Sequence, residues 1–313
     1  MSQLTPLAAT TLSPEQLQKQ QQKKGVLLAL AAFTMWGIAP IYFKQLIHID
    51  ALEILAQRVI WAVIFLIIVS LFSSQLHKTI AILKQPKQLA LLAVSACLLG
   101  FNWGLFIWSV INNHMLEASL GYYVNPLINV LMGYLFLSER LRKRQGLAVV
   151  LALSGVLIQL ISFGSVPYIA LSLAVSFAIY GLLHKKTHIE SIPGLLIEAL
   201  ILLPFAILYW IFMEPSATSN MANNSTSTNL LLLSAGIVTT LPLLCFTGAA
   251  KRLQYSTLGF IQYIGPSLMF ILAVNFYGET LGLKEMITFG FIWLALLVFS
   301  WDSLRHQLKN KAA

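Results

Sequence analysis

The sequence predicts an all-α integral membrane protein with ten transmembrane helices, and two observations carry this prediction. Of the 313 residues, 58% are hydrophobic and 10% are charged, and the mean hydropathy is +0.79. Soluble domains carry about 25% charged residues, and a fold of this length has no core large enough for so much apolar surface. The apolar residues also gather in ten runs, most of them close to the 20 or so residues that cross a bilayer.

The ten runs are separated by short polar breaks. A β-barrel is excluded because its strands are about ten residues of alternating polarity, and in lipid this leaves helices. The first run is longer than the apolar part of a signal peptide, which has about 7–15 residues. The predicted spans are 25–43, 54–72, 89–111, 118–137, 146–162, 166–183, 194–213, 230–250, 256–277 and 284–302.

Lysine and arginine orient these spans. With the N-terminus inside, seventeen of the 20 basic residues fall in cytoplasmic segments, two fall in external breaks, and Arg58 lies within a span. Cytoplasmic loops of membrane proteins carry an excess of Lys and Arg. The split therefore places both termini in the cytoplasm and supports an even number of spans. Residues 1–24 are expected to be a flexible polar tail and residues 303–313 a second cytoplasmic tail.

The net charge of +9 does not indicate nucleic-acid binding, because the basic residues form no long block and lie in the breaks between spans. Cys97 and Cys245 lie inside apolar runs without the spacing of a zinc site or a disulfide framework. The sequence thus predicts no metal and no cofactor.

An internal repeat divides the chain. Ser119-Leu120-Gly121 is echoed by Thr257-Leu258-Gly259, and Tyr123-Val124-Asn125-Pro126 by Tyr263-Ile264-Gly265-Pro266. The prolines of the second match and the pair Glu139 and Glu279 share an offset of 140 residues. The halves are predicted at 25–163 and 164–302, with five spans each. Because five is odd, the halves enter the membrane from opposite sides and form an inverted repeat, as in many secondary transporters.

Several stretches resemble one known family. They are Gly25 to Phe43 with Met35-Trp36-Gly37-Ile38-Ala39-Pro40, Glu53 to Leu55, Arg58 to Trp61, Met115 to Tyr122, and Phe260 with Gln262 to Pro266. In these the chain is similar to the RarD branch of the EamA family, in the drug/metabolite transporter superfamily, from Lys24 to Trp301. The resemblance implies two EamA-type repeats, a bacterial inner-membrane location and export of small metabolites. The family name is linked to chloramphenicol sensitivity.

Prolines inside two spans mark a candidate substrate path. Pro126 and Pro266, the latter preceded by Gly265, are expected helix breaks, because proline lacks an N–H and frees the carbonyl four residues back. In lipid a freed carbonyl needs a partner or a water-filled cavity. Both prolines lie near mid-span, where inverted-repeat transporters bind substrate. The alternative is a packing kink that neighbouring helices satisfy.

Polar and aromatic side chains near these prolines are the candidate lining of one central cavity. Tyr122, Asn125 and Asn129 share a helical face, as Gln262, Gly265 and Met269 do. Asn102 lies mid-span and either bonds another helix or faces water. The substrate-binding candidates are Trp36, Asn102, Trp103, Tyr122, Tyr123, Asn125, Asn129, Tyr180, Gln262 and Tyr263.

Two charges lie within spans, Arg58 and Glu198, and such charges are candidates for function. They occupy equivalent repeat positions, but each is only about 6 Å deep from opposite membrane faces, so no salt bridge between them is expected. The expected local partners are Asp50 or Glu53 for Arg58, and Lys185, Lys186 or His188 for Glu198. Snorkelling of Arg58 to the interface is the alternative.

His114 and Glu117, at an external mouth, are a candidate pair for proton coupling, with a solvated loop as the alternative.

The predicted function is secondary transport of a small organic solute, with export by alternating access through the central cavity. The predicted partners are this small-molecule substrate, membrane lipid and a coupling proton. A membrane-embedded enzyme is the first alternative, although the sequence lacks the HExxH and GxSxG motifs of hydrolases. A channel is the second, although an inverted repeat suits alternating access better.

Overall fold

The computed structural model describes residues 13–112, 114–164, 166–212, 220–276 and 282–312, and every regular element in these ranges is a helix. Ten helical segments are long and apolar enough to cross a membrane, which confirms the predicted number of spans. The helices are α1 (Pro14–Lys44), α2 (Ala51–Phe72), α3 (Leu76–Leu83), α4 (Pro86–Ile111), α5 (Met115–Leu137), α6 (Lys143–Phe163), α7 (Tyr168–Lys186), α8 (Ser191–Phe212), α9 (Thr226–Ala250), α10 (Tyr255–Gln262), α11 (Ile264–Phe276) and α12 (Leu283–Ala312).

The helices begin earlier or end later than the apolar runs at several places. The flexible tail expected at residues 1–24 is helical from Pro14 onward, because Ser13 and Gln16 form a capping box and Pro14 occupies the first helical position. The expected tail at 303–313 likewise continues α12 to Ala312. The short helix α3 was not predicted, since it lies in a polar break and is too short to span.

Carboxylates fix two helix starts from neighbouring elements. Glu117 accepts a hydrogen bond at 2.8 Å from the backbone N–H of Ile169, at the start of α7. Glu139 accepts hydrogen bonds from the backbone N–H groups of Tyr255 at 2.6 Å and Ser256 at 2.9 Å, at the start of α10. The first N–H groups of a helix lack partners within it, so these side chains both cap the helices and tie them to the bundle.

The helix contacts repeat when the two halves are exchanged. The exchange relates α1 to α7, α2 to α8, α4 to α9, α5 to α10 and α11, and α6 to α12. Thus α5 packs on α7 as α11 packs on α1, and α2 packs on α9 as α8 packs on α4. The self-related pairs α2–α8, α5–α10 and α6–α12 are also in contact. The fold is therefore the predicted pair of inverted repeats.

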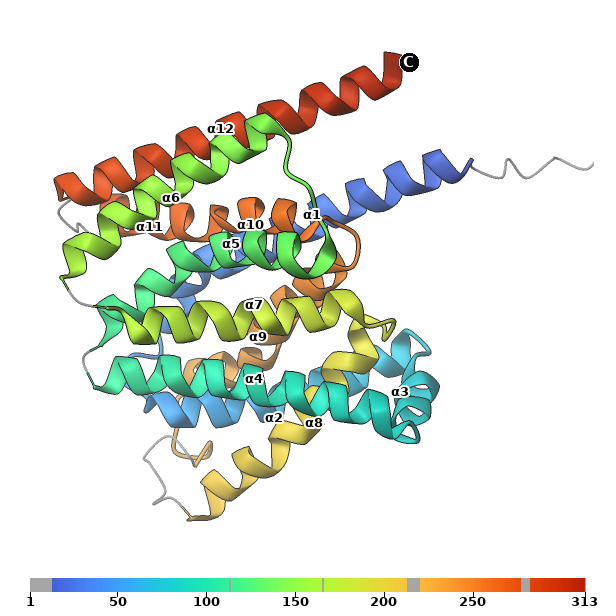
Figure 1. Cartoon of the computed structure of the whole chain (residues 1–313). Helices are drawn as coiled ribbons and strands as arrows, with labels where there is room; N and C mark the ends of the chain where they lie inside the picture. Colours follow the sequence, from blue (N-terminus) through green and yellow to red (C-terminus); the bar gives the residue numbers. More distant parts are fainter. Residues whose placement is uncertain (1–12, 113, 165, 213–219, 277–281, 313) are drawn as a thin grey trace, which may run out of the picture.

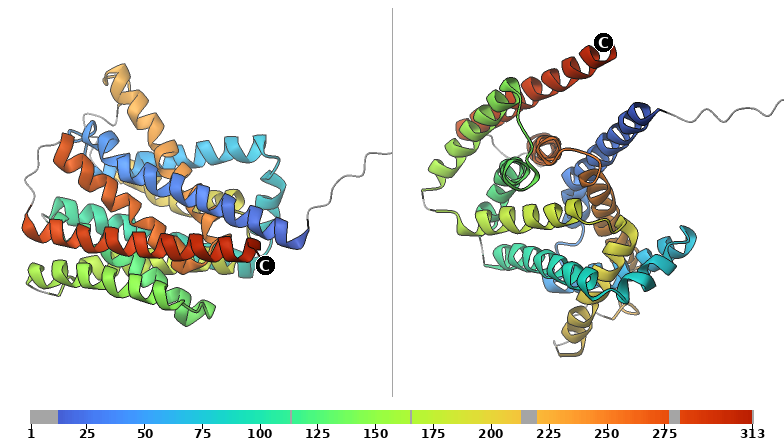
Figure 2. Two further views of the ribbon diagram at one scale, coloured as in Figure 1. Left: turned by 90° about the horizontal axis from the view of Figure 1, so that it is seen from above. Right: turned by 45° about the vertical axis from the view of Figure 1, so that its right-hand side comes forward.

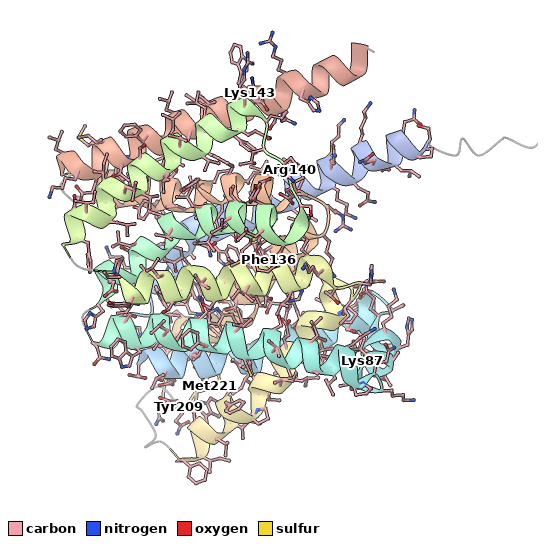
Figure 3. The ribbon with its side chains drawn as sticks, in the orientation of Figure 1. Lys87, Phe136, Arg140, Lys143, Tyr209 and Met221 are labelled. Atoms are coloured by element: carbon pink, nitrogen blue, oxygen red, sulfur yellow. The ribbon has the colours of Figure 1, made fainter. Side chains whose placement is uncertain are left out.

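The start of α1 and the end of α12 lie at the same end of the bundle as α3 (Figure 1). Figures 1 and 2 show α6 and α12 side by side along one edge. In Figure 3, Lys87 lies at the end near α3, whereas Tyr209 lies toward the other end. We call the end of the bundle that holds α3, the start of α1 and the end of α12 the basic end. We call the other end of the bundle the opposite end.

Candidate substrate path

A pocket lies where helices of the two halves meet, between α2, α4, α8 and α9. In this conformation its cavity volume is about 20 Å³, room for about one water molecule, so a solute fits only after the pocket widens. We name it the shared pocket. Its lining residues are Val59, Ala62, Leu66, Leu99, Trp103, Leu195, Glu198, Ala199, Leu202, Thr239, Thr240 and Leu243.

The lining of the shared pocket follows the internal repeat. Four pairs of lining residues are 140 positions apart, namely Val59 and Ala199, Ala62 and Leu202, Leu99 and Thr239, and Trp103 and Leu243. Equivalent positions of the two halves therefore face one space, which places the pocket on the axis that relates the halves. Ligand sites of inverted-repeat transporters lie at such interfaces.

Arg58 lies beside the shared pocket, on the side that is nearer the opposite end of the bundle. Its Nε donates a hydrogen bond at 2.7 Å to Oγ1 of Thr239. Its guanidinium lies 4.7 Å from the centre of the Trp103 ring and 5.6 Å from that of Phe43. Arginine over an aromatic face is attracted by the negative charge of the ring. This side of the pocket is thus cationic and aromatic.

Asp50, one of the two partners expected for Arg58, has another role in the structure. Asp50 caps its own helix instead, because its Oδ1 accepts a hydrogen bond at 2.8 Å from the N–H of Leu52, and free N–H groups at a helix start suit such a carboxylate. Arg58 is half-buried and bonded to α9, so it does not simply snorkel to the interface.

Glu198 forms part of the pocket wall toward the basic end. Its side chain is 1% exposed, and its Oε1 lies 2.8 Å from Nε2 of His184. Tyr180 donates a hydrogen bond at 3.2 Å to Oε2. The expected partners Lys185, Lys186 and His188 are wrong, because His184 and Tyr180 are one turn apart on the face of α7 that meets α8. Glu198 and Arg58 have separate partners, as the depth argument predicted.

Asn125, Asn129 and Gln262 form a buried network between α5 and α10. Gln262 Nε2 donates to Asn125 Oδ1 at 2.6 Å, and Asn129 Nδ2 donates to Gln262 Oε1 at 2.8 Å. Asn125 Nδ2 also donates to the carbonyl of Ala174 on α7 at 2.6 Å. The three side chains are at most 6% exposed. In this conformation they bond to one another and are not part of the shared pocket's lining.

The two expected helix breaks differ. The second is present, since the helix is interrupted at Tyr263, between α10 and α11, and Pro266 lies in the first turn of α11, where its missing N–H costs little. The first is wrong, because α5 continues through Pro126. Packing of α5 on α7 and α10 holds that helix together, as neighbouring helices do for prolines in membranes. Gly37 of α1, and not Gly265, allows close approach of α1 and α11, since a Cβ on Gly37 would lie 3.1 Å from the Gly265 carbonyl oxygen, whereas a Cβ on Gly265 would meet only the Phe33 carbonyl oxygen at 3.7 Å.

The remaining candidates are distributed over several interfaces. Asn102 bonds another helix, because its Nδ2 lies 2.9 Å from both the Leu173 carbonyl and Ser176 Oγ. Trp36 packs in an aromatic cluster with Phe33, Phe177 and Phe246. Tyr263 donates a hydrogen bond at 3.2 Å to the carbonyl of Tyr123.

Tyr122 and the His114–Glu117 pair complete the predicted positions. The Tyr122 side chain is 39% exposed and its ring packs edge-on against Phe106. His114 Nδ1 lies 3.9 Å from Glu117 Oε2, and its ring stacks on Trp108. Of the predicted candidates, then, Trp103 and Glu198 line the shared pocket and Arg58 adjoins it.

Sequence reasoning missed Thr239, Thr240 and His184. Thr239 could have been found as the repeat mate of Leu99, and His184 as the residue one turn after Tyr180. Within the described ranges, no cluster of three or more His, Cys, Asp or Glu side chains suits a metal ion.

Comparison with known proteins shows which family has this architecture. The profile of the EamA-like transporter family matches residues 23–161 and again residues 166–301. A solved crystal structure superposes with a TM-score of 0.70 at 18% identity, over 88% of this chain and 96% of the other, and so supports the fold alone.

Curated relatives match along nearly their whole length. Protein RarD of Escherichia coli (strain K12) is 54% identical over 291 residues, covering 93% of this chain and 98% of that protein. A Vibrio cholerae protein named "Uncharacterized transporter" is 55% identical over 294 residues, covering 94% and 96%. The "Chloramphenicol-sensitive protein RarD" of Pseudomonas aeruginosa is 32% identical over 288 residues, covering 90% and 95%.

Proposed function

The chain belongs to the EamA-like transporter family, and from this premise we propose that it is a secondary transporter that carries a small organic solute through the shared pocket. The observation that carries the proposal is the repeat symmetry of the pocket lining. Four pairs of equivalent residues from the two halves face the same space.

Alternating access follows naturally from this symmetry. If the halves exchange conformations, the pocket opens to one membrane face and then to the other, and the two forms have similar energies because they are built from equivalent packings. The contact pattern of the helices supports such an exchange, since most contacts between spanning helices are matched by their equivalents. A channel would need a continuous pore instead.

The chemistry of the pocket favours an organic solute over a bare ion. Most lining residues are apolar, with Trp103 as the large aromatic surface and Thr239 and Thr240 as hydroxyl groups. Arg58 adds a positive charge beside Trp103. Apolar walls with a few convergent polar groups are typical of small-molecule sites. A relative named chloramphenicol-sensitive makes chloramphenicol a reasonable first compound to test.

The proposed setting is a bacterial inner membrane with the basic end in the cytoplasm, and export is the proposed direction. Seventeen of the 20 lysines and arginines support this orientation. Protease cleavage sites inserted after Arg144 and after Asn224 test it. The first should be cut only from the cytoplasmic side and the second only from the other side. The reverse pattern contradicts the orientation.

Counterflow in proteoliposomes tests the proposed function. Vesicles preloaded with unlabelled chloramphenicol, and in parallel with a panel of amino acids, nucleosides and organic acids, should accumulate the labelled compound transiently and with saturation if the chain is a carrier. A channel gives flux without counterflow, and an enzyme gives chemical change of the compound. Absence of saturable counterflow across the panel contradicts the proposal.

A matched pair of variants ties the flux to the shared pocket. Trp103→Ala removes the aromatic wall and should lower counterflow by about tenfold, the effect of losing about 1.4 kcal/mol of binding. Trp108→Ala, on the same helix but exposed on the bundle surface, is the control and should keep the parent's flux. Equal loss in both variants would assign the effect to folding.

A further inference from the structure

A buried cluster of titratable groups connects α7 and α8 beside the shared pocket. His184 and Glu198 are 2% and 1% exposed, with 2.8 Å between Nε2 and Oε1. Tyr180, which is fully buried, donates to the other carboxylate oxygen and packs its ring 4.7 Å from that of His184. Glu198 also forms part of the pocket wall. Glu198 therefore contacts the shared pocket, which opens and closes in the proposed transport cycle.

The charge of this pair depends on a single proton. With one proton shared between imidazole and carboxylate, the pair is neutral overall, either as an ion pair or as two neutral groups. Without that proton it carries a net negative charge in a poorly polarisable interior, which is unfavourable unless a cation or water compensates.

His184 retains an unused polar atom. Its Nδ1 is buried and has no hydrogen-bond partner among the described residues. In the ion pair, and in the form with a protonated carboxyl, Nδ1 carries a hydrogen that nothing accepts. In the deprotonated form it is a bare lone pair. A buried donor left without an acceptor costs free energy, which offsets part of the cost of the buried negative charge in the deprotonated pair.

Lys251 is a further titratable group that senses the charge of Glu198. Lys251, which follows α9, has a buried Nζ without a hydrogen-bond partner among the described residues. It interacts electrostatically with both Glu190 and Glu198, and burial lowers its pKa to about 8. Glu190 lies at the surface, 2.5 Å from Nζ of Lys78. Lys251 is therefore influenced both by Glu190 at the surface and by the buried Glu198.

Other charged and titratable groups near the pair are occupied elsewhere. Lys185 on α7 donates to the backbone carbonyls of Ala250 and Leu253. Arg252 donates to the Gly248 carbonyl. Tyr255 on α10 donates at 2.6 Å to the carbonyl of Ala178. These contacts leave Tyr180, Lys251 and Glu190 as the groups that respond when the pair changes its charge.

We propose that His184 and Glu198 form a proton-binding site whose occupancy controls the side-chain bridge between α7 and α8 and so couples the shared pocket to a proton gradient. The proposal rests on the proposed function. In each cycle the pair takes up one proton from one side and releases it to the other. The neutral pair keeps the two helices together, and the anionic pair favours entry of water or of a positively charged or hydrogen-bond-donating solute.

Infrared difference spectra test the proton site without any substrate. The full chain is reconstituted in phosphatidylethanolamine and phosphatidylglycerol vesicles and compared between about pH 5 and about pH 9, a range around the ordinary pKa of histidine. The parent should show one carboxyl change that is coupled to an imidazole change, in addition to the imidazole changes of the other five histidines, and this coupled change is the signal that is followed. Glu198→Gln and His184→Asn should each abolish it, and Tyr180→Phe, which removes only a hydroxyl, should shift its midpoint.

The control and a second measurement make the outcome decisive. Glu117→Gln alters another buried carboxylate, near the start of α7, and should leave the change intact. Amide hydrogen exchange of α8, corrected for intrinsic rates, should accelerate at least threefold from low to high pH in the parent and not in Glu198→Gln. A spectral change that survives Glu198→Gln, or no pH effect on exchange, overturns the proposal. Neither result affects the counterflow test, so failure here is distinct from failure of transport.

Discussion

At the residue scale, the polar side chains inside the bundle connect helices of different halves. Asn125 and Asn129 of the first half bond Gln262 of the second, and Asn102 of the first bonds the backbone of α7 in the second. A buried amide left without a partner costs free energy, so each of these bonds favours one relative position of the halves. Polar residues that sequence reasoning assigned to a cavity wall therefore hold the observed conformation together.

The amide network gives a stability prediction. Asn125→Leu leaves Gln262 Nε2 without its acceptor and the Ala174 carbonyl without its donor. We expect the free energy of unfolding in detergent to fall by about 2 kcal/mol, the cost of buried groups left unpaired. Asn112→Ala is the control. Asn112 is exposed and bonds only within its own helix end, so its loss should cost under about 0.5 kcal/mol. Similar losses in both variants, measured by thermal melting, would contradict the assignment.

At the element scale, small residues let helices of the two halves approach closely. A Cβ placed on Gly236 of α9 would lie 2.3 Å from the backbone carbon of Trp61 on α2. A Cβ on Gly259 of α10 would lie 2.6 Å from the carbonyl oxygen of Pro126. Backbone atoms have no room to yield at such distances. Close backbone contact through glycine is a main source of helix association in membranes, where apolar side chains gain little by leaving lipid.

The α2–α9 crossing gives the second stability prediction. Gly236→Ala should push the two helices apart, lower the melting temperature and cost about 2 kcal/mol or more, because the added methyl meets backbone. Gly290→Ala on α12 is the control, since nothing lies within 4 Å of its added Cβ. There the better helix propensity of alanine should leave stability unchanged or raise it by about 0.5 kcal/mol. A neutral Gly236→Ala would show that the crossing is looser than described.

The apolar runs were sufficient to predict every spanning helix, because length and hydropathy decide membrane insertion. The apolar runs did not show whether a helix is interrupted within a span, as Tyr263 and Pro126 illustrate. Both sites have a proline nearby, and only the packing around each decides whether the helix breaks. The partners of Glu198 were missed for a similar reason. Sequence distance favoured nearby lysines, whereas the rotation of α7 turns His184 and Tyr180 toward α8.

At the scale of the whole molecule, the repeat links sequence to mechanism. The offset of 140 residues, visible in the sequence, reappears in the lining of the shared pocket. Which side chains converge there was not predictable, because it depends on how the halves dock, and docking is set by long-range contacts such as α2 with α9 and α5 with α10. The central claim is that this pocket opens alternately to the two sides of the membrane.

Two-sided thiol labelling tests that claim most directly. With Cys97 and Cys245 replaced by serine, single cysteines are placed at the mates Leu99 and Thr239, and at Ala152 as a control in the packed α6–α12 interface. A membrane-impermeant reagent should label positions 99 and 239 in both right-side-out and inside-out vesicles, and position 152 in neither. Protection of both pocket positions from both sides, or labelling from one side alone, would contradict the account.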